Sequence, residues 1–275
     1  MTTRIAVAQF PGSNCERETV EALVAAGAEA EVVRWNAPDD VWSGFAGYVL
    51  PGGFSYEDRV RAGAVAAKHR LLDAIAAGVD AGKPVLGVCN GAQILVEAGL
   101  VPGIETGRVQ IALAGNRTPG WSGYICEWVH LAATARRGWL AVMEGAAQPV
   151  PMPVGNGEGR FTARAEVFDD LARRGQIVFR YVASDGTSAR GAWDNPTGAL
   201  LDAAAVCDPT GTVVALMPHP ERALWLFQVP EELPGPWGVK RREAAGDGVA
   251  LRGPGPGLSL YRALVSQAAG RGGAR

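Results

Sequence analysis

The run KPVLGV at residues 83–88 shows no polar alternation, which is typical of a central strand that helices cover on both faces. Other apolar runs recur along the chain and alternate with segments of helical periodicity. This alternation predicts βαβ units, and hence an α/β fold with an open, mainly parallel sheet flanked by helices. The expected strands are residues 4–10, 30–35, 47–50, 83–88, 124–133, 176–183 and 211–217, and the expected helices are residues 12–28, 63–81, 91–98 and 258–269. The first helix begins with Ser13 and Glu16 in the spacing of a capping box.

The length of 275 residues is enough for one large domain or two small ones. We expect a single domain over residues 1–275. A Pro/Gly-rich insertion at about 229–257 has the composition of a long surface loop rather than of a domain, and a C-terminal helix is expected after it at about 258–269. The segment PVGNGEGRFTA at 153–163 is expected to be an irregular loop.

Charge and composition exclude several classes of function. The net charge of −2 gives no electrostatic reason to expect nucleic acid or an anionic membrane as a partner. No apolar run approaches the roughly 20 residues that span a bilayer, and the start of the chain lacks a signal peptide's cleavage site. We therefore expect a cytoplasmic protein. The four cysteines form no C-x-x-C pair and no phosphate-binding loop is present, so the sequence predicts neither a metal nor a cofactor.

Cys89 stands where the strand at 83–88 turns into the next helix, in the sequence G-V-C-N-G. Gly87 and Gly91 flank it where a Cβ would clash, which is the pattern of a nucleophile elbow with cysteine in place of serine. The N-terminus of the following helix favours a thiolate. A buried, inert cysteine at the end of a strand explains this short motif equally well when it is taken alone.

A second motif, MPHPERA at 217–223, follows another buried strand. That strand would deliver His219 to the same edge of the sheet as Cys89, where open α/β sheets place their sites. Pro220 favours an extended conformation at His219, so Glu221 would project to the same side as the imidazole. The pattern predicts that Glu221 orients His219 and that His219 deprotonates Cys89.

A third strand end carries the glycine pair of VLPGGFSYEDRVRAG at 49–63. The main-chain amides of Gly52 and Gly53 are candidate donors for an oxyanion hole, and the amide of Asn90, directly after the cysteine, is another. Taken alone, P-G-G is more often only a turn. Three strand ends that each carry one catalytic part favour an active site.

Together these motifs resemble the class I (triad) glutamine amidotransferases, and within that class the glutaminase subunits (subunit Q) of phosphoribosylformylglycinamidine synthase. The resemblance covers most of residues 4–224. Its motifs are FPGSNCERE (10–18), VLPGGFSYEDRVRAGA (49–64), GKPVLGVCNGAQILVEAGLVPG (82–103), GEGRF (157–161) and MPHPERA (217–223). The cysteine elbow and P-H-P-E are shared across the class, whereas PGGFSY, RAGA and CNGAQIL are specific to this subunit.

The resemblance implies the flavodoxin-like architecture of the class and a catalytic chemistry. Cys89 would attack the side-chain amide of glutamine, giving a γ-glutamyl thioester and ammonia. His219 would protonate the leaving ammonia and later activate water, while Glu221 stabilises the imidazolium. By the family pattern, Gln93 helps to bind the substrate glutamine.

The resemblance also implies partners. The ammonia would pass to a separate synthetase (large) subunit, which uses ATP to convert formylglycinamide ribonucleotide to formylglycinamidine ribonucleotide in purine biosynthesis. A small accessory subunit usually bridges the two. The absence of a phosphate-binding loop in this chain fits that division. We expect a glutaminase whose activity is low until the partner assembles.

Three features depart from the family pattern. The chain reads Y-E-D at 56–58 where the family usually has Y-G-D, and N-G-E-G-R at 156–160 where H-G-E-G-R is usual. The insertion after Leu226 is longer than expected. None of these departures touches the triad.

Two other functions remain open at this point. A stand-alone cysteine hydrolase, such as a peptidase or a γ-glutamyl hydrolase, would act without a partner and would not prefer free glutamine. A non-catalytic activating subunit could dispense with the triad. Cys15 also lies near an expected helix start, but no histidine accompanies it in sequence, so a structural or partner-facing role is favoured.

Overall fold

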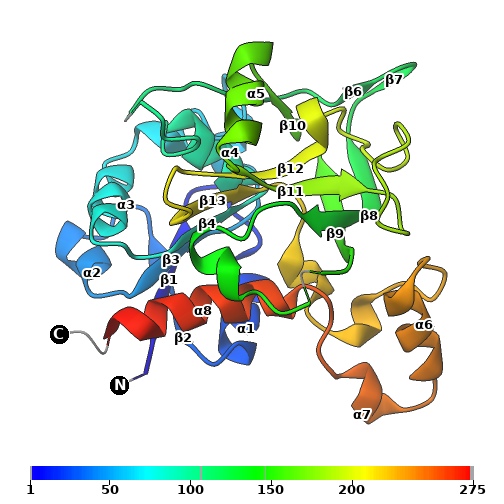
Figure 1. The fold of residues 1–275 in the computed structure, drawn as a ribbon. Coiled ribbons are helices and arrows are strands. Elements are labelled where there is room, and N and C mark those ends of the chain that lie inside the picture. Colours follow the sequence, from blue (N-terminus) through cyan, green and yellow to red (C-terminus); the bar gives the residue numbers. More distant parts are fainter. Residues whose placement is uncertain (1, 106, 146, 273–275) are drawn as a thin grey trace.

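A computed structural model describes residues 2–105, 107–145 and 147–272 (Figure 1). Its centre is a nine-stranded sheet in the order β2-β1-β3-β4-β13-β12-β11-β8-β9. The first five strands in that order are parallel neighbours: β2 (Glu29–Arg34), β1 (Arg4–Gln9), β3 (Gly47–Leu50), β4 (Val85–Val88) and β13 (Val213–Leu216). This parallel half confirms the expected open α/β sheet.

The other half of the sheet is antiparallel. It consists of β12 (Ala203–Cys207), β11 (Ile177–Val182), β8 (Ile125–Ala133) and β9 (Val150–Asn156). Two small sheets accompany it, one from β5 (Ala112–Ala114) with β10 (Arg160–Thr162) and one from β6 (Arg117–Thr118) with β7 (Trp121–Ser122).

Helices cover both faces of the sheet. Figure 1 shows α1 (Glu16–Ala25) and α8 (Leu258–Gly272) on one face and α4 (Asn90–Glu97) and α5 (Ala165–Arg173) on the other. The short α2 (Asp39–Ser43) packs with α3 (Leu71–Asp80). All four residues of β3 and of β4 are buried, as expected for central strands covered on both sides. None of the described helices is long and apolar enough to cross a membrane.

The register of the parallel strands brings three strand ends level. Leu50 of β3 pairs with Gly87 of β4, and Leu216 of β13 pairs with Val88. The chain therefore leaves all three strands at one edge of the sheet. This edge is where open α/β folds bind their ligands.

Two expectations near the N-terminal half are wrong in detail. Ser13 is not a helix cap: α1 begins after Cys15 without a side-chain cap, and the Ser13 hydroxyl accepts a hydrogen bond from the amide of Phe10 at 3.1 Å. Of the helix expected over 63–81, only the part from Leu71 to Asp80 forms an α-helix (α3), because the extended backbone at His69 interrupts it. The His69 ring instead accepts a hydrogen bond from the amide of Leu71, near the start of the helix, at 3.2 Å.

The segment 153–163 is not an irregular loop. Residues up to Asn156 belong to β9, whose buried positions include Val150, Met152 and Val154, and residues 160–162 form β10. Prolines conceal the strand pattern in the sequence, but β9 is the last strand of the sheet, and an edge strand tolerates residues without an amide hydrogen.

The insertion at 229–257 is also not the loop that its composition suggested. It contains α6 (Pro236–Glu243) and α7 (Gly248–Leu251), and the side chain of Asp247 caps α7 by accepting from two amides. Leu226, Val229 and Leu233 form a small buried cluster under these helices. The apolar residues of this segment are too sparse to form a helical pattern in the sequence, and they bury each other only when the segment folds back on itself. The single-domain organisation over residues 1–275 stays a prediction.

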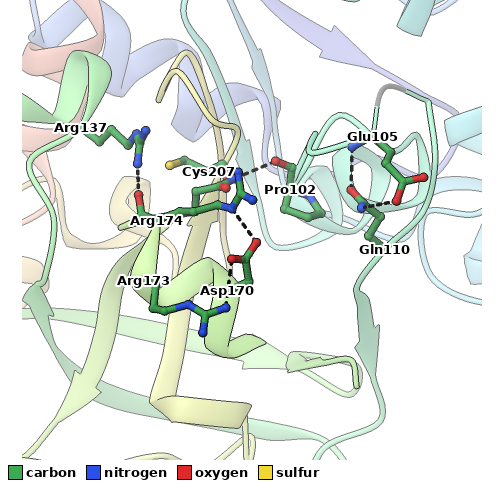
Figure 2. A network of polar contacts seen from close by, with 9 residues as sticks. Pro102, Glu105, Gln110, Arg137, Asp170, Arg173, Arg174 and Cys207 are labelled. Atoms are coloured by element: carbon green, nitrogen blue, oxygen red, sulfur yellow. Dashed lines mark hydrogen bonds and ion pairs between the residues drawn. The ribbon is translucent and has the colours of Figure 1, made fainter. Parts of the chain in front are cut away.

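A polar network fastens α5 to its neighbours (Figure 2). Arg173, the last residue of α5, and Arg174, which follows it, both pair with Asp170 of that helix, and the guanidinium of Arg137 donates to the main-chain carbonyl of Arg174. The buried amide of Gln176 donates to the carbonyl oxygens of Pro102 and Cys207, each at 2.8 Å. The loop after α4 is thereby joined to β12.

Candidate active site

Cys89 is the residue between β4 and α4, and its backbone takes φ 50° and ψ −106°. This region is strained for an L-residue, so the sharp turn expected from the sequence is confirmed. A Cβ on Gly91 would lie 1.9 Å from the carbonyl oxygen of Leu50, and a Cβ on Gly87 would lie 2.6 Å from the carbonyl oxygen of Gly91. Both glycines are therefore needed for α4 to begin this close to the strands.

His219 and Glu221 form a buried pair just beyond β13. The imidazole Nδ1 lies 2.6 Å from Oε1 of Glu221, and both side chains are almost fully buried. The backbone of His219 is extended, as expected before Pro220. The hydroxyl of Tyr261, from α8, donates to the second carboxylate oxygen of Glu221 at 3.5 Å.

The charge of this pair favours the imidazolium. Burial by itself lowers the pKa of His219, but the negative charges of Glu221 and Cys89 outweigh it and hold that pKa well above its usual value. An imidazolium whose Nδ1 is bound to a carboxylate can donate a proton from Nε2. That is the form required to protonate a leaving amine.

Cys89 and His219 line the same cavity, which has a volume of about 200 Å³. Sγ of Cys89 lies 3.7 Å from the carbonyl oxygen of Gly155, and the buried Nε2 of His219 has no hydrogen-bond partner among the described residues. Cys89 and His219 thus line one hollow without a well-formed hydrogen bond between them. Such bonds often tighten only when a substrate is bound.

The glycine pair after β3 is held by the loop that follows β1. The carbonyl oxygen of Gly52 accepts from the amides of Asn14 and Cys15, both at 3.2 Å, and Gly53 forms an isolated bridge with Ser13. A Cβ on Gly52 would lie 2.7 Å from Cε1 of His219, so only glycine lets the strand end this close to the imidazole. Gly53 lines the cavity. The oxyanion roles of Gly52, Gly53 and Asn90 stay predictions.

The side chain of Asn90 joins α4 to the loop that carries the glycines. Its Oδ1 accepts from the amide of Ser55 at 3.0 Å, and its Nδ2 donates to Oε1 of Gln93 at 2.9 Å. Gln93 lines the cavity, and its Nε2 donates to the carbonyl oxygen of Glu158 at 2.8 Å. The Gln93 amide thus connects Asn90 to the segment at Glu158 on the side of the cavity. Its contact with glutamine stays a prediction.

Cys15, for which the sequence favoured a structural or partner-facing role, lies next to His219 and Glu221. Ligand atoms of Cys15, His219 and Glu221 lie within 4.8 Å of one another, and all three residues are buried. The guanidinium of Arg222 donates to Sγ of Cys15 at 3.2 Å. A cation next to the thiol disfavours a metal ion at this cluster. The sequence did contain a signal for this contact, because Cys15 and Arg222 each lie inside a motif that carries the resemblance.

Two carboxylates that sequence reasoning did not single out also line the cavity, Asp58 and Glu158. Burial, and then the charge of Glu158, raise the pKa of Asp58 to about 6. Asp58 belongs to the Y-E-D triplet and Glu158 to the N-G-E-G-R stretch, the two motifs where the chain departs from the family pattern. Those departures were the sequence signal that could have drawn attention to Asp58 and Glu158.

Comparison with known proteins supports the resemblance. The model of the family described as CobB/CobQ-like glutamine amidotransferase domain matches residues 2–245. Phosphoribosylformylglycinamidine synthase subunit PurQ from Methanothrix thermoacetophila is 38% identical over 239 residues, which cover 84% of this chain and 90% of that protein. The protein of the same name from Mycobacterium bovis is 40% identical over 238 residues, covering 86% of this chain and 92% of that protein.

Solved structures agree with the sequence comparisons. A chain in the structure of PurLQS from Thermotoga maritima superposes with a TM-score of 0.68 at 29% identity, covering 97% of this chain and 99% of that chain. The glutaminase domain of CTPS from Trypanosoma brucei superposes with a TM-score of 0.53 at 14% identity, covering 96% of this chain and 94% of that chain, which is a likeness of fold alone.

Proposed function

The chain belongs to the CobB/CobQ-like glutamine amidotransferase domain family, and we propose that within this family it is the glutaminase subunit of phosphoribosylformylglycinamidine synthase in purine biosynthesis. The observation that carries the proposal is the shared cavity: the strained Cys89 and His219 line one hollow of about 200 Å³, and Glu221 is bound to the imidazole behind it. A nucleophile, a base and an orienting carboxylate are the parts that acyl transfer requires.

The reaction proceeds in two halves. The Cys89 thiolate attacks the side-chain carbonyl carbon of glutamine, and main-chain amides stabilise the oxyanion. His219 gives its Nε2 proton to the departing nitrogen, which leaves as ammonia, and a γ-glutamyl thioester remains. Water then loses a proton to His219 as it attacks the thioester, releasing glutamate and restoring the thiolate. Glu221 keeps the imidazole in the required orientation throughout.

The ammonia needs an acceptor outside this chain. The relatives are named as subunits of a synthase, and the similar solved structure is named PurLQS. We propose that the chain assembles with a large synthetase subunit, which consumes ATP and formylglycinamide ribonucleotide, and with a small accessory subunit. We also propose that activity is low before assembly.

We also propose a cytoplasmic location. Cys15, Cys89, Cys126 and Cys207 are all free thiols. Unpaired cysteines, one of them exposed, fit a reducing compartment.

The test is glutamine hydrolysis by the full chain, alone and with both partner subunits, ATP and formylglycinamide ribonucleotide. Weak activity alone should rise on assembly and vanish in Cys89→Ala, whereas Cys126→Ala, which removes an exposed thiol, should behave as the parent. Cys15→Ala should still form the thioester, detected by mass spectrometry on Cys89. A glutamyl adduct on Cys15, or hydrolysis that survives Cys89→Ala, would contradict the assignment of the nucleophile.

A further inference from the structure

The buried thiol of Cys15 takes part in none of the proposed steps of glutamine hydrolysis, although it lies beside the His219–Glu221 pair. Its Sγ and the ligand atoms of His219 and Glu221 all lie within 4.8 Å of one another. Cys15 is completely buried and is not one of the described residues that line the cavity. Any effect of this thiol on the reaction must therefore pass through a neighbouring side chain.

The sulfur of Cys15 is held by two polar partners. The guanidinium of Arg222 donates to Sγ at 3.2 Å, and the thiol donates to Oδ1 of Asn14 at 3.1 Å. Both partners line the cavity. With one donor and one acceptor engaged, the thiol has a fixed orientation next to the imidazole.

Gly52 provides the space in which the sulfur and the imidazole meet. A Cβ on Gly52 would lie 2.7 Å from Cε1 of His219 and 3.1 Å from Sγ of Cys15. The amide of Cys15 donates to the carbonyl oxygen of Gly52 at 3.2 Å, which joins the start of α1 to the segment after β3. The backbone therefore brings the sulfur and the ring together beside one glycine.

The same sulfur supports two cations. Burial lowers the pKa of Arg222, but contact with Cys15, ahead of the charges of Glu221 and Cys89, raises it above its usual value. Burial also lowers the pKa of His219, and Cys15 is among the groups, after Glu221 and Cys89, that raise it. Two like charges this close disfavour each other unless a group between them compensates.

The other groups around the imidazole come from three elements. Glu221 lies on the same turn, Cys89 lies at the start of α4, and Tyr261 of α8 reaches the ring only through Glu221. In α1, Glu16 and Glu21 are bound to other side chains. The strand β9, whose main chain accepts from the amide of the histidine, carries no titratable side chain.

We propose that Cys15 is a positioning residue: its sulfur, fixed by Arg222, holds the imidazole of His219 in place and shields the imidazolium from the guanidinium. The imidazole then keeps Nε2 available to the departing nitrogen. This inference rests on the proposed glutaminase function and adds a further side chain to the support of its acid and base.

The first experiment measures kcat, KM and their pH dependence for glutamine hydrolysis by the assembled complex. Cys15→Ala should lower kcat by about 10- to 100-fold, the scale of a small misplacement of a reacting group, and should leave KM within about threefold. The basic limb of kcat/KM should move to lower pH, because the imidazolium loses the sulfur and faces Arg222. Cys15→Ser should restore most of kcat, since a hydroxyl also accepts and donates. Cys207→Ala, the same change at another buried thiol, should match the parent.

A double-mutant cycle tests the shielding of the imidazolium directly. In the Cys15→Ala background, Arg222→Met removes the unshielded charge and should move the basic limb back towards that of the parent. In the parent background the same change should shift the limb less, because the sulfur is still present. Cys15→Ser provides the same cycle if the alanine variant does not fold.

The outcomes separate this inference from the function on which it rests. A kcat for Cys15→Ala equal to that of the parent would overturn the positioning role. A loss of kcat with an unmoved basic limb, or one that Arg222→Met leaves in place, would show that Cys15 only packs, and would also overturn it. Absence of any glutamine hydrolysis by the parent complex would instead refute the glutaminase function.

Discussion

His219 has the most unusual electrostatics of the described residues that line the cavity. It is almost fully buried, yet its pKa lies well above the usual value because Glu221 and Cys89 supply negative charge. A buried imidazolium exists only where such charge compensates its lost hydration. The pair therefore keeps the imidazole of His219 protonated where it lines the cavity.

Replacement of Glu221 by glutamine should separate the two effects of the carboxylate. Glu221→Gln removes the charge that raises the pKa of His219, so the imidazolium should lose its proton at lower pH and the basic limb of the kcat/KM profile should move down. Loss of the orienting charge should also lower kcat by about 10²- to 10⁴-fold. Tyr261→Phe, which removes only a 3.5 Å contact to Glu221, should have a much smaller effect. An unshifted basic limb would exclude Glu221 as the partner that raises this pKa.

Glu57 is a residue with a conformational cost. Its backbone takes φ 59° and ψ 27°, a left-handed conformation between two other left-handed residues, Tyr56 and Asp58. Glycine, which the resemblance predicts at this position, adopts this region without strain. Its exposed side chain pairs with Arg59, an ion pair of small energetic value.

Glycine at position 57 should therefore stabilise the protein. Glu57→Gly should raise the free energy of unfolding by about 1 kcal/mol, the scale of the left-handed penalty for an L-residue. Glu57→Ala keeps the Cβ and should give no such gain. Urea denaturation of both variants measures the difference, and equal stabilities would show that the backbone strain at 57 is negligible.

Among the elements, α4 positions the site through its close approach to the sheet. The first turn of α4 packs against β3, and Gly91 is the point of contact with the carbonyl of Leu50. Asn90 then joins α4 to the 3₁₀ turn through Ser55 and Asp58. The first turn of α4 thus positions Cys89, the loop after β3 and Asp58.

A methyl group on Gly91 should disrupt the packing of α4 against β3. In Gly91→Ala the new Cβ would lie 1.9 Å from a backbone atom that no rotamer change can move, so we expect a loss of about 3 kcal/mol in the free energy of unfolding. Gly115→Ala is the matched control, because a Cβ there meets nothing within 4 Å. Thermal unfolding of the two variants provides the measurement. Similar melting temperatures would mean that α4 can shift without cost.

Across the whole molecule, the site collects parts from both halves of the sheet. The parallel half supplies Cys89, His219 and the glycine pair at adjacent strand ends. The antiparallel half supplies Gly155 and Asn156 from its edge strand β9, and α8, near the C-terminus, supplies Tyr261. Both halves must therefore fold before the cavity has a complete wall.

The parallel half of the sheet, the turn at Cys89 and the placement of His219 beside Glu221 were predictable because their signals are local. An apolar run without alternation marks a buried central strand, and glycines two residues on either side of Cys89 mark a turn that no other residue fits. The P-H-P-E spacing likewise determines locally that His219 and Glu221 share a side. The family motifs depend on the same short stretches.

Other features depend on contacts between residues that are distant in sequence. These are the antiparallel half of the sheet, the helices of the insertion and the placement of Asp58 and Glu158 at the cavity. Prolines hid β9, whose place at the sheet edge is a property of the whole sheet. Arg222 reaches Cys15 across 207 positions, and Ala62 reaches Glu158 across 96. Local sequence was therefore enough to predict the strand ends around Cys89 and the pairing of His219 with Glu221, while their catalytic roles stay predictions. The charges that surround the triad became known only from the folded chain, because the cost of burying a charge depends on neighbours that sequence spacing does not specify.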